Sequence, residues 1–506
     1  MRKTLTSLLL ACALLLSCMP ALSEAASQAG ENFVMAGFDG DSVQHDWNTN
    51  LFFQRMQERT GISFTFRQFT DYAAWSAEKA RLFAGDDLPD VLFKAELTPQ
   101  ETVSYYESGK LIDLKPYLAE NAPNLTALFA KHPDWEKAVT LADGAIVALP
   151  ALDSLHTQNA MWINKTWLEA LKLDMPTDAA SLINVLTAFK NDDPNRNGKK
   201  DEIPFTFLGP WDLKFLAHAF GQIANDYNVY ADGAGKVHFM AAEDTYREFV
   251  AWAAELYQKG LLDKNGFSTA DALRTVTDEK AAAVYGVFFA NKSTAFLTSA
   301  LGSQYTVLQP LSWEGTQTYR DFLGPVTRGT FAITSACKDP AALIRWVDSL
   351  YGEEGGVLAL FGLEGTEYAY NENGTWRFLG ATEELTSILQ NATICDSGFL
   401  PWLDPVDFQL KHEDQNTTAL IRSLLELNQI AVLPFPYYTL TAQEQAYIDP
   451  LQMALGTFVD ESLARFVTGE TPLDDASWQE YLSNLDQMGL PDFTAFWQQV
   501  LDGQAR

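Results

Sequence analysis

The sequence predicts an α/β protein of two connected lobes with a helix-rich C-terminal portion. At 506 residues the chain is longer than one hydrophobic core normally serves. Strand and helix patterns alternate through the first part of the chain, whereas mostly helical patterns follow from about Ile421. No low-complexity linker or internal repeat separates the halves. We therefore expect two α/β lobes between which the chain passes more than once.

The first elements follow the order of βαβ units. Residues 33–38, 61–69 and 89–94 have the short apolar or alternating patterns of strands. Helical spacing of apolar residues begins at Leu51 and, in a second segment, ends at Gly85. Strands separated by helices in this way favour a parallel sheet.

Later segments add a second set of elements. Residues 160–164 predict a strand, and residues 165–173 predict the helix after it. Asp178 stands where the N-cap of a longer helix is expected. Two segments, 229–239 and 368–378, alternate around a glycine-bearing turn and predict β-hairpins.

The charge balance excludes one large class of partners. The chain has 35 Lys and Arg against 66 Asp and Glu, a formal net charge of −31. Nucleic-acid binding requires neutralising phosphates with basic side chains, so we expect no nucleic-acid partner. A local basic pocket for an acidic ligand stays compatible with this balance, because net charge governs solubility and steering rather than one site.

The N-terminus has the features of a targeting segment, residues 1–25. Two basic residues precede the apolar run 5–17, which is short for a membrane span. LLSC, ending at Cys18, resembles a bacterial lipobox, and the small-x-small sequence 23–25 suits ordinary signal peptidase. We expect an extracytoplasmic protein, either a lipid-anchored cell-surface lipoprotein or a freely secreted one.

Cysteine usage is sparse in the mature chain. Cys337 and Cys395 remain after the leader. An exported protein can pair them, but one bridge is no disulfide scaffold, and two free buried thiols are the alternative.

The stretch DDPNRNGKKDEIPF, residues 192–205, gathers oxygen-bearing side chains at regular spacing. Asp193, Asn195 and Asn197 occupy positions 1, 3 and 5 of an EF-hand start, and a glycine follows at position 6. Lys199 stands at position 7, which contributes a backbone carbonyl. Position 12 is proline instead of the usual glutamate, although Asp201 and Glu202 precede it. These oxygens suit Ca²⁺, and a solvated turn is the alternative.

Signatures of catalysis are missing from the sequence. The six histidines are scattered, and the chain has no HExxH, CxxC or G-x-S-x-G motif. GAGKV at 233–237 imitates only part of a P-loop and lies in an expected hairpin turn. Carboxylates are so abundant that a glycosidase-like pair can arise by chance.

Several residues follow predicted strands or lie in Gly/Pro-bearing loops, where ligand-binding residues of doubly wound sheets occur. Packing in the core or in ordinary loops is the alternative for each of them. The candidates for ligand contact are Asp39, Trp47, Trp211, Tyr285 and Trp402.

Several segments resemble the large bacterial extracellular solute-binding proteins of family 1, of which the alginate-oligosaccharide-binding protein is the nearest described type. The loop is similar to the family signature DPNGNGKKDEIP, and the similarity extends over most of the mature chain. The other matching segments are GKLIDLKPYLAENAPNL (109–125), DGAIVALP (143–150), MWINKTWLEALKLDMPT (161–177), EFVAWAAELYQKGLLD (248–263), RWVDSLYGEEG (345–355), FGLEGTEY (361–368) and FVTGETPLDDASWQEYLSNLDQMGL (466–490).

This resemblance implies a periplasmic-binding-protein-like fold with a ligand cleft at the hinge. We expect an N-terminal lobe of residues 31–157 with 330–395, and a C-terminal lobe of residues 158–329 with 396–506. It also implies a structural Ca²⁺ in the signature loop. The ligands carried over are Asp193, Asn195, Asn197, the Lys199 carbonyl, Asp201 and Glu202.

The function implied is the substrate-binding component of an ABC importer, a non-enzymatic monomer whose partners are an oligosaccharide or related small solute and the membrane permease subunits. Aromatic faces stack on sugar rings while polar side chains bond to hydroxyls. Two alternatives stay open: a secreted polysaccharide-degrading enzyme and a sensor lipoprotein with the same binding fold.

Overall fold

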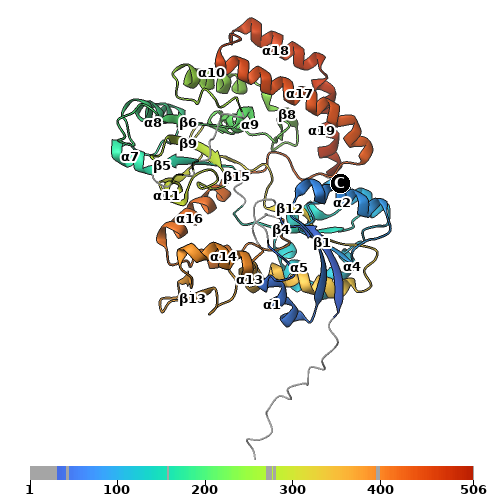
Figure 1. Cartoon of the computed structure of the whole chain (residues 1–506). Helices are drawn as coiled ribbons and strands as arrows, with labels where there is room; N and C mark the ends of the chain where they lie inside the picture. The colour runs from blue at the N-terminus through green and yellow to red at the C-terminus, as the bar shows by residue number, and fades with distance from the viewer. Residues whose placement is uncertain are drawn as a thin grey trace, which may run out of the picture.

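The computed structural model describes residues 31–40, 45–155, 159–268, 276, 278, 281–394 and 399–504. Two lobes, each with its own sheet and hydrophobic core, lie one above the other in Figure 1. The expected two-lobed α/β architecture is therefore confirmed. The proposed leader and Cys395 lie outside the described residues.

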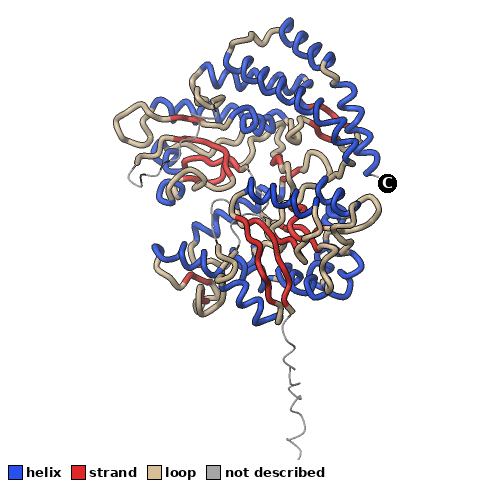
Figure 2. The backbone as a smooth tube through the Cα atoms, turned by 45° about the vertical axis from the view of Figure 1, so that its right-hand side comes forward, coloured by secondary structure: helices blue, strands red, loops and turns tan. Residues whose placement is uncertain are grey.

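The first lobe is built on a five-stranded sheet of order β2-β1-β3-β12-β4. Strands β2 and β3 pair parallel to β1, whereas β12 pairs antiparallel to both β3 and β4. The long parallel pair of this sheet is prominent in Figure 2. The strands are β1 (Asn32–Phe38), β2 (Ser63–Phe69), β3 (Val91–Phe93), β4 (Ala148–Leu152) and β12 (Val326–Ile333).

Each face of this mixed sheet carries a buried core cluster, as expected where helices cover both sides. Side chains alternate along β1, so that Met35 packs into one core cluster and Ala36 into the other. The helices of this lobe are α1 (Leu51–Thr60), α2 (Tyr72–Ala84), α3 (Pro99–Glu107), α4 (Lys115–Asn121), α5 (Pro123–Lys131), α6 (Pro133–Val139), α12 (Pro340–Asp348) and α13 (Glu353–Phe361).

The second lobe has a four-stranded sheet of order β10-β5-β9-β6. Its strands are β5 (Ala160–Asn164), β6 (Ile203–Phe205), β9 (Tyr285–Ala290) and β10 (Tyr305–Leu308), and β6 pairs parallel to β9. Its helices are α7 (Lys165–Leu171), α8 (Ala179–Asn191), α9 (Gly209–Lys214), α10 (Asp244–Gln258), α11 (Ser299–Gly302), α16 (Gln415–Gln429), α17 (Ala442–Thr468), α18 (Asp475–Gln487) and α19 (Leu490–Gln504).

Local sequence signals start and stop these elements as expected. Asp178 caps α8, since its side chain accepts a hydrogen bond from Ser181 N and the Ser181 hydroxyl accepts from Asp178 N. Thr441 and Glu444 form the same reciprocal box at the start of α17, the longest helix. Both expected hairpins are present, as β7 (Val229–Ala231) with β8 (Val237–Phe239) and as β13 (Tyr368–Tyr370) with β14 (Trp376–Phe378).

A small extension lies beside the first lobe, at the lower left of Figure 1. It contains β13, β14, α14 (Thr382–Ala392) and α15 (Val406–Gln409) around a separate aromatic cluster. The Arg55 guanidinium on α1 donates two 2.9 Å hydrogen bonds to the Glu367 carboxylate, which fasten the extension to the lobe.

The chain passes between the lobes after β4, after β11 (Tyr319–Arg320), and between α15 and α16. Strand β11 pairs with β15 (Ala431–Val432) on the second-lobe side. On the first-lobe side, Leu152 N donates to the Trp402 carbonyl at 2.8 Å. Several crossings of the chain at one junction are typical of a hinge between lobes.

One expected lobe boundary is wrong. Residues from 396 onward were expected in the C-terminal lobe. In the structure, Leu400 and Trp402 instead pack in the first-lobe core with β1 and α12. The chain returns to the second lobe at α16, whose Leu427 lies in the second-lobe core. Apolar side chains at 400 and 402 fit either lobe by composition, and only the pairing with β4 decides which lobe they join.

Candidate ligand and calcium sites

The sheet registers show which strand ends face the opposite lobe. Strand β12 starts just after the chain returns from the second lobe, and β3 runs antiparallel to it. The carboxyl ends of β3 and of its parallel neighbour β1 therefore lie at the junction. In the second lobe, β5 starts just after the crossing and pairs antiparallel to β9, so the carboxyl ends of β9 and β6 also face the junction. Ligands of open α/β sheets bind outside such ends.

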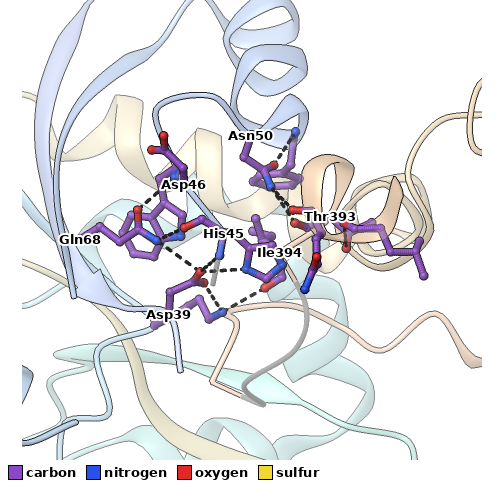
Figure 3. A network of polar contacts seen from close by, with 12 residues as sticks. Asp39, His45, Asp46, Asn50, Gln68, Thr393 and Ile394 are labelled. Atoms are coloured by element: carbon purple, nitrogen blue, oxygen red, sulfur yellow. Dashed lines mark hydrogen bonds and ion pairs between the residues drawn. The ribbon is translucent and has the colours of Figure 1, made fainter. Parts of the chain in front are cut away.

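Asp39 follows β1 at this edge, but it belongs to a buried ion-pair network (Figure 3). Its carboxylate accepts hydrogen bonds from Lys94 Nζ and His45 Nδ1, both at 2.8 Å. Lys94 also donates to the Ile394 carbonyl at 3.0 Å. Burial by itself raises the pKa of Asp39, but the His45 hydrogen bond and the Lys94 charge outweigh it and leave the pKa lowered.

Asp39 therefore ties β1 and β3 to the segment after α14, and the prediction that it contacts ligand is not supported. Asn50 reinforces the same link, because its amide donates to the carbonyls of Gln390 and Thr393 while its oxygen caps α1. The sequence placed Asp39 at a strand end correctly but did not reveal its buried cation, Lys94, 55 residues away.

Trp47 is fully buried and is a core residue, contrary to the prediction. Its ring lies 5.6–5.7 Å from those of Phe53, Phe66 and Phe93. Gly37 on β1 makes room for it, since a Cβ there would stand 2.9 Å from the indole and 1.7 Å from the Phe93 carbonyl oxygen. The indole thus fills the space between sheet and helix α1.

Tyr285 and Trp402 are also buried, so the structure does not support the prediction of ligand contact for either residue. Tyr285 begins β9 instead of following a strand, which puts it at the sheet edge away from the junction, packed on Phe296. Trp402 lies near the junction, but only 8% of its surface is exposed and its ring belongs to the first-lobe core.

Trp211 is the predicted ring that the structure leaves open, with 36% of its surface exposed. It stands on the first turn of α9, just beyond β6, at the edge that faces the first lobe. Its ring makes perpendicular contacts with Phe215 and Phe322, at centroid distances of 5.0 and 5.6 Å. Its Nε1 donates to Asp226 Oδ1 at 2.9 Å. The indole is thus fixed in place while remaining accessible.

An ion pair bonded to Trp211 was not predicted from the sequence. Arg320 Nη2 donates to Asp226 Oδ1 at 2.9 Å, and the guanidinium lies 4.3 Å from the Phe215 ring centroid. The Arg320 side chain is 5% exposed and the Asp226 side chain 43% exposed. Burial lowers the pKa of Arg320, while the Asp226 charge opposes the change. These residues are 94 positions apart, and no local pattern joins them.

A second polar group spans the junction itself. Arg328 on β12 donates from Nη1 to the Tyr438 carbonyl at 2.7 Å, and its guanidinium carbon lies 5.6 Å from the Tyr437 ring centroid. The Tyr437 hydroxyl accepts a hydrogen bond from Val326 N at 3.1 Å. Burial raises the pKa of Tyr438, with Asp226 among the nearby carboxylates that add to the rise. Arg328 therefore links β12 of the first lobe to the segment that precedes α17 in the second.

The predicted calcium loop connects α8 to β6 and is folded tightly on itself. Asp193 carboxylate oxygens accept from the backbone N–H groups of Asn197 and Gly198, each at 3.1 Å. The Asn195 and Asn197 amides both donate to Asp201 at 3.0–3.3 Å. The spacing seen in the sequence thus brings these side chains together around one turn.

Glu202 provides the test of whether this loop suits a cation. Its Oε1 is a buried oxygen without a hydrogen-bond partner among the described residues. Burial raises the pKa of Glu202, and the Asp201 and Asp193 carboxylates add to the rise. In the described chain, no group of three or more His, Cys, Asp or Glu side chains would itself hold a metal. A cation at this loop therefore needs the Asn195 and Asn197 amide oxygens as well, a donor set that suits Ca²⁺.

Two further features bear on the sequence predictions. Cys337 is half-buried at the edge of the first-lobe core, and burial raises the pKa of its thiol to about 11. Whether it pairs with Cys395 was left open by the sequence, and Cys395 lies outside the described part of the chain. Among the described helices, none has the length and apolarity required to cross a bilayer.

The chain matches no protein-family model. It is 28% identical over 497 residues to the fructooligosaccharide ABC transporter substrate-binding protein FusA of Streptococcus pneumoniae serotype 4, and the match covers 90% of this chain and 87% of FusA. The chain is a homologue of ABC-transporter substrate-binding proteins. The family resemblance drawn from the sequence motifs is thereby confirmed.

Solved structures agree with this homology at the level of the fold. The structure of FusA in complex with kestose has a TM-score of 0.70 to this chain at 24% identity, and the alignment covers 93% of this chain and 99% of FusA. An extracellular solute-binding protein from Bifidobacterium longum subsp. infantis gives a TM-score of 0.76 at 21% identity, over 94% and 99%. The alginate-binding protein AlgQ2 without calcium ion gives 0.65 at 22% identity, over 94% and 99%.

Proposed function

We propose that this chain is the extracytoplasmic substrate-binding component of an ABC importer and that it captures an oligosaccharide between its lobes. The observation that carries the proposal is the match to a fructooligosaccharide-binding importer component along 90% of this chain. Because the match also covers 87% of that relative, which is a substrate-binding protein, the alternative of a polysaccharide-degrading enzyme is disfavoured.

The junction provides the chemistry that sugar binding requires. Trp211 offers an exposed indole, and Asp226 offers an exposed carboxylate bonded to it. Apolar C–H faces of a sugar ring stack on aromatic rings, and hydroxyls donate to carboxylates. On the first lobe, Arg328 lies at the junction, where its guanidinium is bonded to the Tyr438 carbonyl.

Capture would proceed by a hinge motion of two rigid bodies. We take these bodies to be residues 31–155 with about 326–413, and residues 159–320 with 415–504, as their cores indicate. A ligand that touches both lobes stabilises the closed form only through contacts that the open form lacks. Affinity and closure are then one equilibrium.

A structural Ca²⁺ is part of this proposal. Asp193, Asn195, Asn197, the Lys199 carbonyl, Asp201 and Glu202 would hold it, with the buried Glu202 oxygen as the strongest support. The ion would neutralise the clustered carboxylates and stiffen the α8–β6 connection, away from the ligand. A solved structure of FusA is of an EF-hand mutant in complex with fructo-nystose, so that relative has an EF-hand element.

Export and membrane attachment complete the proposal. An importer component of this kind works outside the cytoplasm, where it delivers its ligand as a monomer to the permease subunits. We propose that the leader is removed and that Cys18 becomes the lipidated first residue. The intact mass of the native protein checks this, because a diacylglycerol-bearing Cys18 and a plain Ala26 terminus differ in mass. An unprocessed Met1 chain in the cytoplasm would contradict it.

Calorimetry with a panel of neutral and acidic oligosaccharides, kestose among them, tests the binding function. We expect one class to bind, and chromatography of the recovered sugar to show it uncut. Cleaved products would instead indicate an enzyme, and a lack of binding to every sugar would contradict the proposal. Uptake of the labelled sugar by a strain that lacks this protein separates transport from sensing. Loss of an importer component abolishes uptake even when the permease subunits are expressed independently. Loss of a sensor changes gene expression, but uptake continues when the transporter is expressed independently.

A further inference from the structure

The exposed charge beside Trp211 is negative. Asp226 and Arg320 form an ion pair in which the carboxylate is 43% exposed and the guanidinium only 5% exposed. A ligand resting on the indole therefore meets the carboxylate first, with the compensating cation behind it. The sign of the accessible group is a property of packing, because the pair as a whole is neutral.

The Asp226 carboxylate is also held in a fixed orientation with acceptor capacity left over. Trp211 Nε1 and Arg320 Nη2 both donate to Oδ1, each at 2.9 Å. From the described residues, no hydrogen bond reaches Oδ2. An ionised carboxylate accepts at both oxygens, so Oδ2 can accept from a hydroxyl that lies over or beside the indole.

Other buried cations near the junction are already compensated. Lys94 is paired with Asp39 at 2.8 Å, and Lys214 with Asp460 at 3.0 Å. Arg328 is bonded to the Tyr438 carbonyl and lies over the Tyr437 ring. At Trp211 itself, however, the local field opposes a ligand carboxylate.

We infer that Asp226 is a specificity-determining residue that accepts a hydroxyl hydrogen bond from the sugar stacked on Trp211 and selects neutral oligosaccharides over uronic-acid ones. This inference rests on the proposed function, since it concerns the same site. Arg320 acts as a positioning residue, because its hydrogen bond to Oδ1 holds the Asp226 carboxylate in place. Like charges placed together at a binding surface cost affinity for the wrong partner, which is how the site discriminates.

The test compares the wild type with Asp226→Asn, using the tightest neutral oligosaccharide from the binding panel and an alginate oligosaccharide of equal length. Wild type should prefer the neutral sugar. Asp226→Asn should weaken neutral-sugar binding by about 10- to 100-fold, the range for a hydrogen bond to a charged group. The substitution should also reduce the ratio of the affinity for the neutral sugar to that for the alginate oligosaccharide, because the Asp226 charge that repels the uronate is gone. Asp475→Asn is the matched control, since it removes an exposed, arginine-paired carboxylate on α18 and should change neither affinity.

Each outcome separates this inference from the proposed function. Wild type that binds no sugar contradicts the proposed function itself. Wild type that binds the uronate more tightly, or an Asp226→Asn protein that binds the neutral sugar as well as wild type does, overturns the inference while the binding function stands. If Asp226→Asn fails to fold, Asp226→Glu keeps Arg320 paired but moves the carboxylate by one methylene, and undiminished binding by that variant also overturns the inference.

Discussion

Two clusters at the junction each pair an aspartate with a buried basic side chain, but the aspartates differ in their exposure to solvent. In the first lobe, Asp39 pairs with Lys94 beyond the ends of β1 and β3, and both side chains are fully buried. In the second lobe, Asp226 pairs with buried Arg320 beside the loop that follows β6, and its carboxylate is open to solvent. One pair has a carboxylate that no ligand can reach, and the other presents its carboxylate next to an exposed indole.

This difference shows that a strand-end position alone does not make a binding residue. Asp39 is covered because Lys94, His45 and the segment at Ile394 close over it. The Asp226 carboxylate stays accessible because Trp211 and Arg320 both donate to the same oxygen, Oδ1. The number and direction of neighbours decide whether such a group stabilises the fold or contacts a ligand.

The largest expected effect separates the two indoles. Trp47→Ala should lower the free energy of unfolding by about 3–5 kcal/mol, as large-to-small changes in a packed core do. Trp211→Ala should cost less stability than Trp47→Ala, because the ring is partly exposed, and should weaken sugar binding by about 1–3 kcal/mol, the scale of one aromatic face. Urea unfolding and calorimetry measure the two quantities. If the Trp211→Ala protein loses stability but binds sugar normally, Trp211 is a core residue and not a ligand contact.

The two carboxylates should differ in a similar way. Asp39→Asn leaves Lys94 buried without its anion and should cost about 3–5 kcal/mol of unfolding free energy. Asp226→Asn should cost less, because its site is open to water. Since the pKa of Asp39 is lowered in the folded protein, its contribution is present above the ordinary aspartate pKa and lost as the pH falls. Equal losses in the two variants at neutral pH would contradict this contrast.

A third carboxylate, that of Asp212 in α9, extends the comparison to the pH dependence of stability. Among the described residues, Asp212 accepts hydrogen bonds from two neutral donors, Leu208 N and the Asn159 amide, and burial raises its pKa to about 6. Its stability contribution is therefore fully present below the ordinary aspartate pKa of about 4 and is lost as the pH rises through about 6, by up to about 3 kcal/mol. Asp212→Asn should flatten that decline in thermal unfolding between pH 4 and 7. An unchanged pH profile would show that Asp212 is ionised like Asp39.

Calcium should stabilise one lobe and not the other. At a free concentration a hundredfold above its dissociation constant, the ion adds about 2.7 kcal/mol or less to the unfolding free energy. EDTA should therefore lower the melting temperature of the wild type, whereas the Asp193→Ala, Asp201→Ala double variant should be less stable and insensitive to EDTA. Asp192→Ala, beside the loop but outside the ligand set, is the control and should keep the EDTA response. A wild type that ignores prolonged EDTA treatment would leave the solvated turn as the better account.

Local spacing in the sequence was sufficient for the elements and for the oxygen-rich loop. The strands at 33–38 and 160–164, the cap at Asp178 and both hairpins depend on neighbours a few residues apart, and such signals act before any tertiary contact forms. The side chains from Asp193 to Glu202 meet for the same reason, because one short turn contains them all.

Tertiary structure alone decided exposure at the junction. Trp47 and Trp211 both follow predicted strands, yet the space beside Gly37 buries one and the first turn of α9 leaves the other open. The pairs Asp39–Lys94 and Asp226–Arg320 join residues 55 and 94 positions apart, and the assignment of Trp402 to the first lobe depends on a backbone bond to Leu152. Burial and ion pairing are sums over neighbours that are distant in the chain, so no local pattern could specify them.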